Sequence, residues 1–194
     1  LMMVFGALVL AVLGYFAYNQ FYVGPRNEEA TLSYLAAQKN LADGKDDLAL
    51  GGKTAANPGF LGTYNDFSGT KVGKLSAYNA GLIKFKEGKY QEAYDLLDKF
   101  SSDNKTLMAL KYGAMADCQS NLNKNDDALS LLDKATSASD DPYTSYYFTR
   151  KAGLVALALK KNAEAKKYFT TIDEKYQDYD NGMSDSYIEM VKYY

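Results

Sequence analysis

The chain has 194 residues, and its 22 Lys and Arg nearly balance its 24 Asp and Glu, which leaves a formal net charge of −2. The basic residues are almost all Lys, with Arg only at Arg26 and Arg150, and no basic run occurs. Proteins that bind nucleic acid rely on Arg side chains and basic stripes. We therefore expect no nucleic-acid partner.

The composition also argues against catalysis. The sequence has no His, which excludes Ser-His-Asp and Cys-His mechanisms and every metal site that needs His. Cys118 is the only cysteine, so no intramolecular disulfide can form, and its helical, partly apolar context indicates a core residue. No glycine-rich phosphate loop or cluster of metal ligands is visible. We expect no enzyme, no cofactor, no metal and no small-molecule substrate.

The first 22 residues, LMMVFGALVLAVLGYFAYNQFY, carry no charge. Eighteen apolar or small residues rise roughly 27 Å as a helix, which matches the hydrocarbon core of a bilayer. Aromatic residues crowd the end of this run, where an interfacial belt is expected. A cleaved signal peptide would have a shorter apolar region and a small-residue cleavage site, and a buried soluble helix would show a polar face.

We therefore expect a transmembrane anchor at 1–22 and a linker at 23–29, where Pro25 interrupts the pattern. Leu1 lies inside the apolar run, so we expect further residues to precede it. The flanking charges that would set membrane orientation are missing on that side.

A spacing of twelve residues recurs in the rest of the chain. It separates small residues in three pairs: Gly81 and Ala93, Ala116 and Ala128, and Gly153 and Ala165. A large residue follows each pair by four positions: Leu97, Leu132 and Phe169. A fixed spacing within each unit indicates two antiparallel helices that cross where small residues let the backbones approach, because a larger side chain there would overpack the crossing.

This pattern resembles the tetratricopeptide repeat (TPR). A Leu-Gly pair and an Ala-x-x-x-Phe element mark that family at a period of about 34 residues. Here Ala80-Gly81, Met115-Ala116 and Ala152-Gly153 match the first element, and the segment GKYQEA (88–93) matches the turn into the second helix. The chain departs from the family where Lys84, Gln119 and Ala156 replace its Tyr.

The expected fold is therefore all-α: a single transmembrane helix followed by a short TPR-like solenoid of helical hairpins with a C-terminal capping helix. A weaker pair, Ala37 and Ala49, precedes the clear units, and Gly51-Gly52 interrupts its second helix. The expected units are a degenerate first unit at 30–71, TPR units at 72–107, 108–142 and 143–180, and a capping helix at 181–194, as solenoid ends require.

Similarity to this family implies that the first helix of each pair lines a partner-binding groove. The groove candidates are Tyr78, Leu82, Phe85, Leu110, Asp117, Asn121, Tyr147, Arg150 and Leu154. This mainly apolar lining suits an amphipathic helix or an extended apolar segment, although apolar helical stripes are often core. The stretch YTSYYF (143–148) adds Tyr143, Tyr146 and Phe148 as exposed contact candidates, with packing against a neighbouring helix as the alternative.

One anchor followed at once by TPR units resembles the YfgM-type ancillary subunits of the Sec translocon, in their Bacteroidetes-like form. The similarity rests on YNQFYVGPRNEEA (18–30), on GKYQEA and on ALKYGAMADC (109–118). It implies a bacterial inner-membrane protein with its repeats in the periplasm, associated with SecYEG and a PpiD-type chaperone. The alternative is a structural scaffold in another cell-envelope or secretion assembly.

Overall fold

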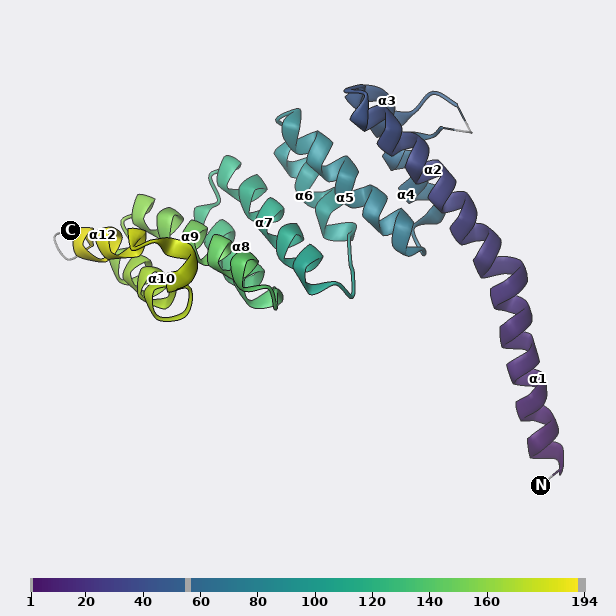
Figure 1. Cartoon of the computed structure of the whole chain (residues 1–194). Helices are drawn as coiled ribbons and strands as arrows, with labels where there is room; N and C mark the ends of the chain where they lie inside the picture. The colour runs from purple at the N-terminus through teal and green to yellow at the C-terminus, as the bar shows by residue number, and fades with distance from the viewer. Residues whose placement is uncertain (1, 55–56, 192–194) are drawn as a thin grey trace. The chain divides into compact units, whose positions relative to one another are not determined.

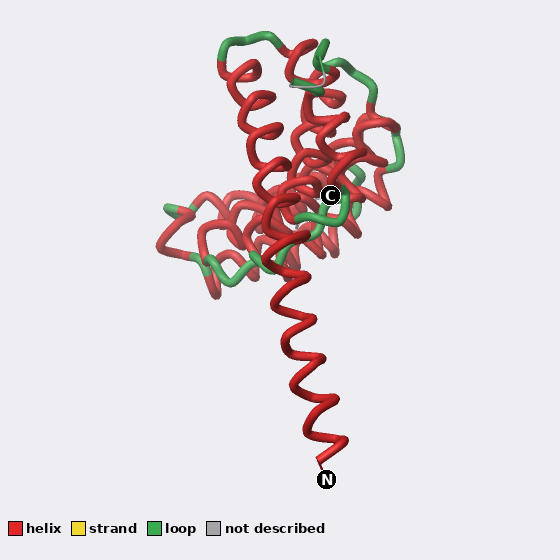
Figure 2. Tube along the Cα trace, turned by 90° about the vertical axis from the view of Figure 1, so that its right-hand side faces the viewer, coloured by secondary structure: helices red, strands yellow, loops and turns green. Residues whose placement is uncertain are grey.

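The computed structural model describes residues 2–54 and 57–191. Within these residues the chain is helical and forms no β-strand, only an isolated bridge between Thr54 and Asn57 (Figure 2). The chain divides into two compact parts, 1–80 and 81–194, and each is described by itself. The all-α expectation is therefore confirmed for the described residues.

The first part contains a long N-terminal helix and one hairpin (Figure 1). Its elements are α1 (Met2–Tyr18), η1 (Asn19–Val23), α2 (Gly24–Ala42), α3 (Asp46–Gly51), α4 (Gly59–Phe67) and the beginning of α5 (Lys71–Lys86). The second helix of the hairpin is thus split into α3 and α4. Gly52 and Gly59 bracket the split, and both have positive φ, at 44° and 71°, which favours glycine.

The N-terminal helix runs without a break from α1 through η1 into α2. The expected linker at 23–29 is wrong, because these residues are helical. Pro25 lies in the first turn of α2, and the π-helical turn before it lets the N–H of Gly24 bond to the carbonyl of Asn19. The proline, which lacks an N–H, is accommodated beside this wider turn.

The same helix is the one candidate membrane span in the described residues. Residues Phe5–Ala42 form a helix of 38 residues that is long and apolar enough to cross a bilayer, and none of its most apolar window is buried. Phe5, Leu10 and Phe21 are largely exposed. By length and composition, this segment is therefore a candidate membrane span.

Polar contacts hold α4 against α2. The hydroxyls of Ser33 and Thr63 lie 2.6 Å apart at the buried crossing, with Ala30 and Ala37 beside them. The guanidinium of Arg26 donates to the carbonyl of Asp66, near the end of α4, at 2.5 Å and lies over the Phe67 ring. A cation at a helix C-terminus complements the helix dipole. The split hairpin is thereby fastened to the continuous helix.

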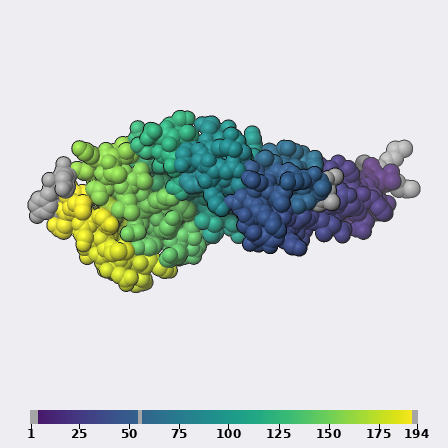
Figure 3. Space-filling model, turned by 90° about the horizontal axis from the view of Figure 1, so that it is seen from above, coloured from purple at the N-terminus to yellow at the C-terminus, as the bar shows by residue number. Residues whose placement is uncertain are grey.

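The second part contains the last residues of α5 followed by hairpins that succeed one another along the chain (Figure 1), with colours from teal to yellow in the space-filling view (Figure 3). Its helices are α6 (Tyr90–Lys99), α7 (Lys105–Asn121), α8 (Asn125–Ala138), α9 (Pro142–Ala158), α10 (Asn162–Lys175), α11 (Gln177–Asp180) and α12 (Met183–Met190). Helices α7, α8, α9 and α10 pack in sequence order, and α12 packs on α10. This is the arrangement of a helical solenoid.

Each hairpin turn has the same backbone form. A left-handed residue, at Gly44, Gly88, Asn123 or Lys160, precedes a lysine that begins the second helix. The φ and ψ angles of these lysines are nearly constant, from −95° and 65° at Lys45 to −86° and 66° at Lys161. First helices begin differently: Asn104 and Asp141 cap α7 and α9 through their side chains.

The helices of each pair cross at small residues. A methyl group on Gly81 would lie 2.9 Å from Cγ of Leu97 and 3.1 Å from the carbonyl oxygen of Ala93. A methyl group on Gly153 would lie 2.9 Å from the ring of Phe169. Both distances are shorter than van der Waals contact, so larger side chains do not fit without movement. The remaining residues of the three pairs, Ala116, Ala128 and Ala165, are buried.

Candidate functional site

The outward stripes of α7 and α9 form the candidate site. Residues three or four apart share one side of a helix. On α7 and α9 this side leaves half-buried or exposed side chains, which we call the A face: Leu110, Ala114, Asp117 and Asn121, and Tyr147, Arg150, Lys151, Leu154 and Ala158. The opposite sides of both helices are buried among the hairpins.

An ion pair joins the two stripes. The ammonium of Lys151 on α9 lies 2.6 Å from a carboxylate oxygen of Asp117 on α7, and 6.0 Å from the centre of the Tyr147 ring. The side-chain amide of Asn121 donates to the carbonyl of Asp117 at 2.9 Å. The ion pair balances the charges of Lys151 and Asp117 at the centre of the A face, beside the Tyr147 ring.

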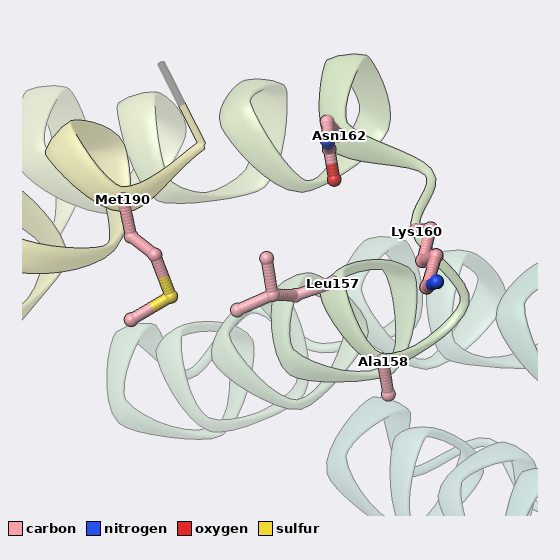
Figure 4. A pocket seen from close by; sticks show the side chains of 5 residues that line it. All are labelled: Leu157, Ala158, Lys160, Asn162 and Met190. Atoms are coloured by element: carbon pink, nitrogen blue, oxygen red, sulfur yellow. The ribbon is translucent and has the colours of Figure 1, made fainter. Parts of the chain in front are cut away.

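Apolar groups flank that centre. Leu110 is 40% exposed and Tyr147 is 49% exposed. A pocket of about 460 Å³ opens where the A face reaches the end of α9. Figure 4 shows two of its lining side chains, the thioether of Met190 from α12 and the side chain of Leu157, pointing toward one another. Ala158, Lys160 and Asn162 complete the lining. Exposed apolar groups gathered around a polar pair are typical of protein contact surfaces.

Arg150 has unused hydrogen-bonding capacity. Its Nε atom is buried and has no hydrogen-bond partner among the described residues. The side chain lies one turn from Tyr146, on the same helix as Lys151. Arg150 adds a positive charge to this region, and the carboxylate of Asp180 lies near the same tyrosine. An acidic group on a partner would complement it.

The structure does not bring all the groove candidates together. Tyr78 is half-buried and belongs to the first part of the chain, where burial raises the pKa of its phenol. Leu82 is 39% exposed at the end of α5. Phe85 packs on the ring of Tyr90, with centroids 5.3 Å apart, and so contributes to the turn between α5 and α6. The remaining candidates lie on the A face.

The expectation that Tyr146 and Phe148 are exposed is wrong. Both are buried, at 7% and 3% exposure. Phe148 fills the space above Gly113 on α7, where even a methyl group would clash with its ring. The Tyr146 hydroxyl donates to the buried carboxylate of Asp180 at 3.2 Å. Of the three aromatic candidates, only Tyr143 is exposed.

Several contributors to the site were not predicted from the sequence, among them Lys151 and Met190. Lys151 follows Tyr147 by four residues, a spacing that places both on one side of a helix and was available as a signal. Met190 had no such signal, because its position depends on how α12 packs against α10. No group of metal-binding side chains occurs among the residues that the structure describes.

Comparison with known proteins identifies the fold and no more. No known protein family matches the chain, and no curated protein matches it either. Among solved structures, the crystal structure of MamA protein is similar, with a TM-score of 0.60 and 17% sequence identity over 85% of this chain and 81% of that chain. MamA contains tetratricopeptide repeats, so the likeness supports a TPR-type fold here.

Proposed function

We propose that this protein is a membrane-anchored interaction module that binds a protein partner through the A face. The observation that carries the proposal is the pairing of Lys151 with Asp117 beneath exposed apolar side chains such as Leu110 and Tyr147. Rigidly held aromatic rings lose little entropy on binding and often dominate interface energy. The apolar lining and Arg150, whose Nε has no hydrogen-bond partner among the described residues, favour an amphipathic segment that carries an acidic residue.

The anchor is the second element of the proposal. We infer that α1 spans a bilayer, because its apolar side chains are exposed and its composition suits the hydrocarbon core. Tethering a binding surface to a membrane raises its effective concentration near partners in the same membrane, so weak contacts suffice.

The finer assignment rests on the sequence resemblance. We propose an ancillary role at a SecYEG-type channel of the bacterial inner membrane, with the repeats in the periplasm and a PpiD-type chaperone as neighbour. Emerging polypeptides are the expected clients. No residue of the A face has a catalytic role in this proposal.

Site-specific crosslinking tests the proposal. A photoreactive residue at Tyr147 or Leu154 is expected to capture translocon or chaperone subunits in cells, while the same residue at Lys167, exposed on α10, captures none. Capture of another envelope assembly from Tyr147 would instead support the scaffold alternative. Equal capture from Tyr147 and Lys167 would show that the A face is not the contact surface.

A further inference from the structure

A second recess lies on the other side of α7. Gln119 follows Asp117 by two residues, about 200° around the helix, and therefore points away from the A face. The recess holds about 230 Å³ and lies where α6, α7 and α8 meet. We call it the polar notch, and its lining residues are Tyr94, Gln119, Asp127, Ser130, Leu131 and Lys134.

Gln119 is the feature that marks this notch as a binding site. The side chain is 6% exposed, and its carbonyl oxygen has no hydrogen-bond partner within the described structure. A buried amide without a partner is destabilising until a donor reaches it. The equivalent residues of the neighbouring hairpins do not place an unpartnered polar group there. Lys84 pairs with Glu87 and Glu92, and Ala156 is apolar.

Two opposite charges lie at the two ends of the mouth of the notch. Asp127 and Lys134 are exposed on α8, and neither forms an ion pair with a described residue. Seven residues separate them, which corresponds to about 10.5 Å along the helix. Ser130 lies between them on the same side, with Gln119 and Tyr94 on the facing helices. The notch thus has an acid at one end, a base at the other and neutral hydrogen-bonding groups between.

These dimensions match one class of molecule. An extended peptide advances about 3.3–3.6 Å per residue, so three residues span about 10 Å. A peptide of that length with free ends carries an ammonium and a carboxylate at this separation and amide groups between them. A single amino acid is too short to reach both charges, and an internal segment of a longer chain supplies them only where a basic and an acidic side chain have this spacing.

We propose that the polar notch binds a short peptide of about three residues with free termini. Its ammonium pairs with Asp127 and its carboxylate with Lys134, while its amides hydrogen-bond with the Gln119 amide and the hydroxyls of Tyr94 and Ser130. This activity is separate from partner binding at the A face and differs from the expectation that the chain takes no small ligand.

Trialanine is the probe that tests the proposal, with the full chain in mild detergent. Exposed ion pairs contribute little, so we expect a dissociation constant of about 1 mM. Saturating trialanine should raise the unfolding temperature by a few degrees and shift the NMR signal of the Gln119 side-chain amide. Trialanine that is acetylated at its N-terminus and amidated at its C-terminus should do neither.

Variants separate binding from folding. Gln119→Tyr should fill the notch and abolish the response while the protein remains folded by circular dichroism. Lys134→Gln should weaken binding about two- to fivefold, the effect of removing one exposed ion pair, and Lys167→Gln, a matched change on α10, should not. The proposal is overturned if trialanine gives no response, if the blocked peptide binds equally well, or if Lys134→Gln binds like the parent protein.

Discussion

The ammonium of Lys111, on α7, donates to the carbonyl oxygen of Phe100 at 2.8 Å, where α6 ends. It also donates to the carbonyl of Asp98 at 3.0 Å, and the lysine is only 6% exposed. The last carbonyls of a helix lack intrahelical partners. Lys111 therefore satisfies the end of α6 and places positive charge at the negative end of its dipole.

Replacing Lys111 with Met should lower the free energy of unfolding by about 2–4 kcal/mol, because two carbonyls lose a charge-assisted donor. Denaturant unfolding in detergent measures the change. Lys167→Met removes a lysine of the same size from an exposed position on α10 and should have an effect within about 0.5 kcal/mol. Equal losses in the two variants would show that the hydrogen bonds of Lys111 contribute nothing.

Gly153→Ala tests the close approach of α9 and α10. The added methyl would lie 2.9 Å from the Phe169 ring, so we expect a loss of about 1–3 kcal/mol from overpacking. Combining it with Phe169→Leu should cost less than the sum of the two single changes. Gly51→Ala, at a helical site with nothing within 4 Å, should stabilise by about 0.5–1 kcal/mol. A loss at Gly51 that matches the loss at Gly153 would contradict this explanation.

The burial of Cys118 should slow the reaction of its thiol with alkylating agents. Burial, with a smaller contribution from the carboxylate of Asp117, raises the pKa of its thiol from 9.0 to about 11. At pH 7.5 the folded protein should react with iodoacetamide about 100-fold more slowly than the urea-unfolded chain, because a pKa higher by two units reduces the thiolate fraction by that factor well below both pKa values. Rapid alkylation of the folded protein would contradict the burial of this thiol.

The same shift has a consequence for stability. Between pH 9 and about 11 the folded thiol keeps its proton while the unfolded thiol loses it. The unfolded state then binds fewer protons, so stability falls as pH rises through this interval and is fully retained below it. Cys118→Ala should show a smaller fall over the same interval in urea-unfolding measurements.

The helical fold could be predicted because its cause is local. Small residues twelve apart, such as Gly81 and Ala93, mark antiparallel helices whatever surrounds them. The constant turn could also have been found, since a lysine follows the left-handed residue of each hairpin turn, as at Gly88 and Asn123. The continuity of the N-terminal helix was missed because Pro25 reads as a break, and only the π-helical turn shows how the helix passes it.

The candidate site was harder to predict from the sequence, because the exposure of a side chain depends on neighbours that are distant in sequence. Phe148 is buried only because Gly113, 35 residues earlier, leaves room for its ring. Tyr146 is buried because α11 brings Asp180 to its hydroxyl. The polar notch likewise requires α6, α7 and α8 in place. An aromatic-rich segment indicates contact surface, but packing decides which ring faces outward.

The unbroken course of α1, η1 and α2 has a mechanical meaning. A continuous helix, even one that contains a π-helical turn and a proline, couples its two ends more tightly than a flexible linker would. Any tilt or rotation of the apolar segment is therefore passed to α2, and through Arg26 and Ser33 to α4. The orientation of the first hairpin is therefore coupled to the orientation of the apolar segment, and the hairpin does not rotate freely about it.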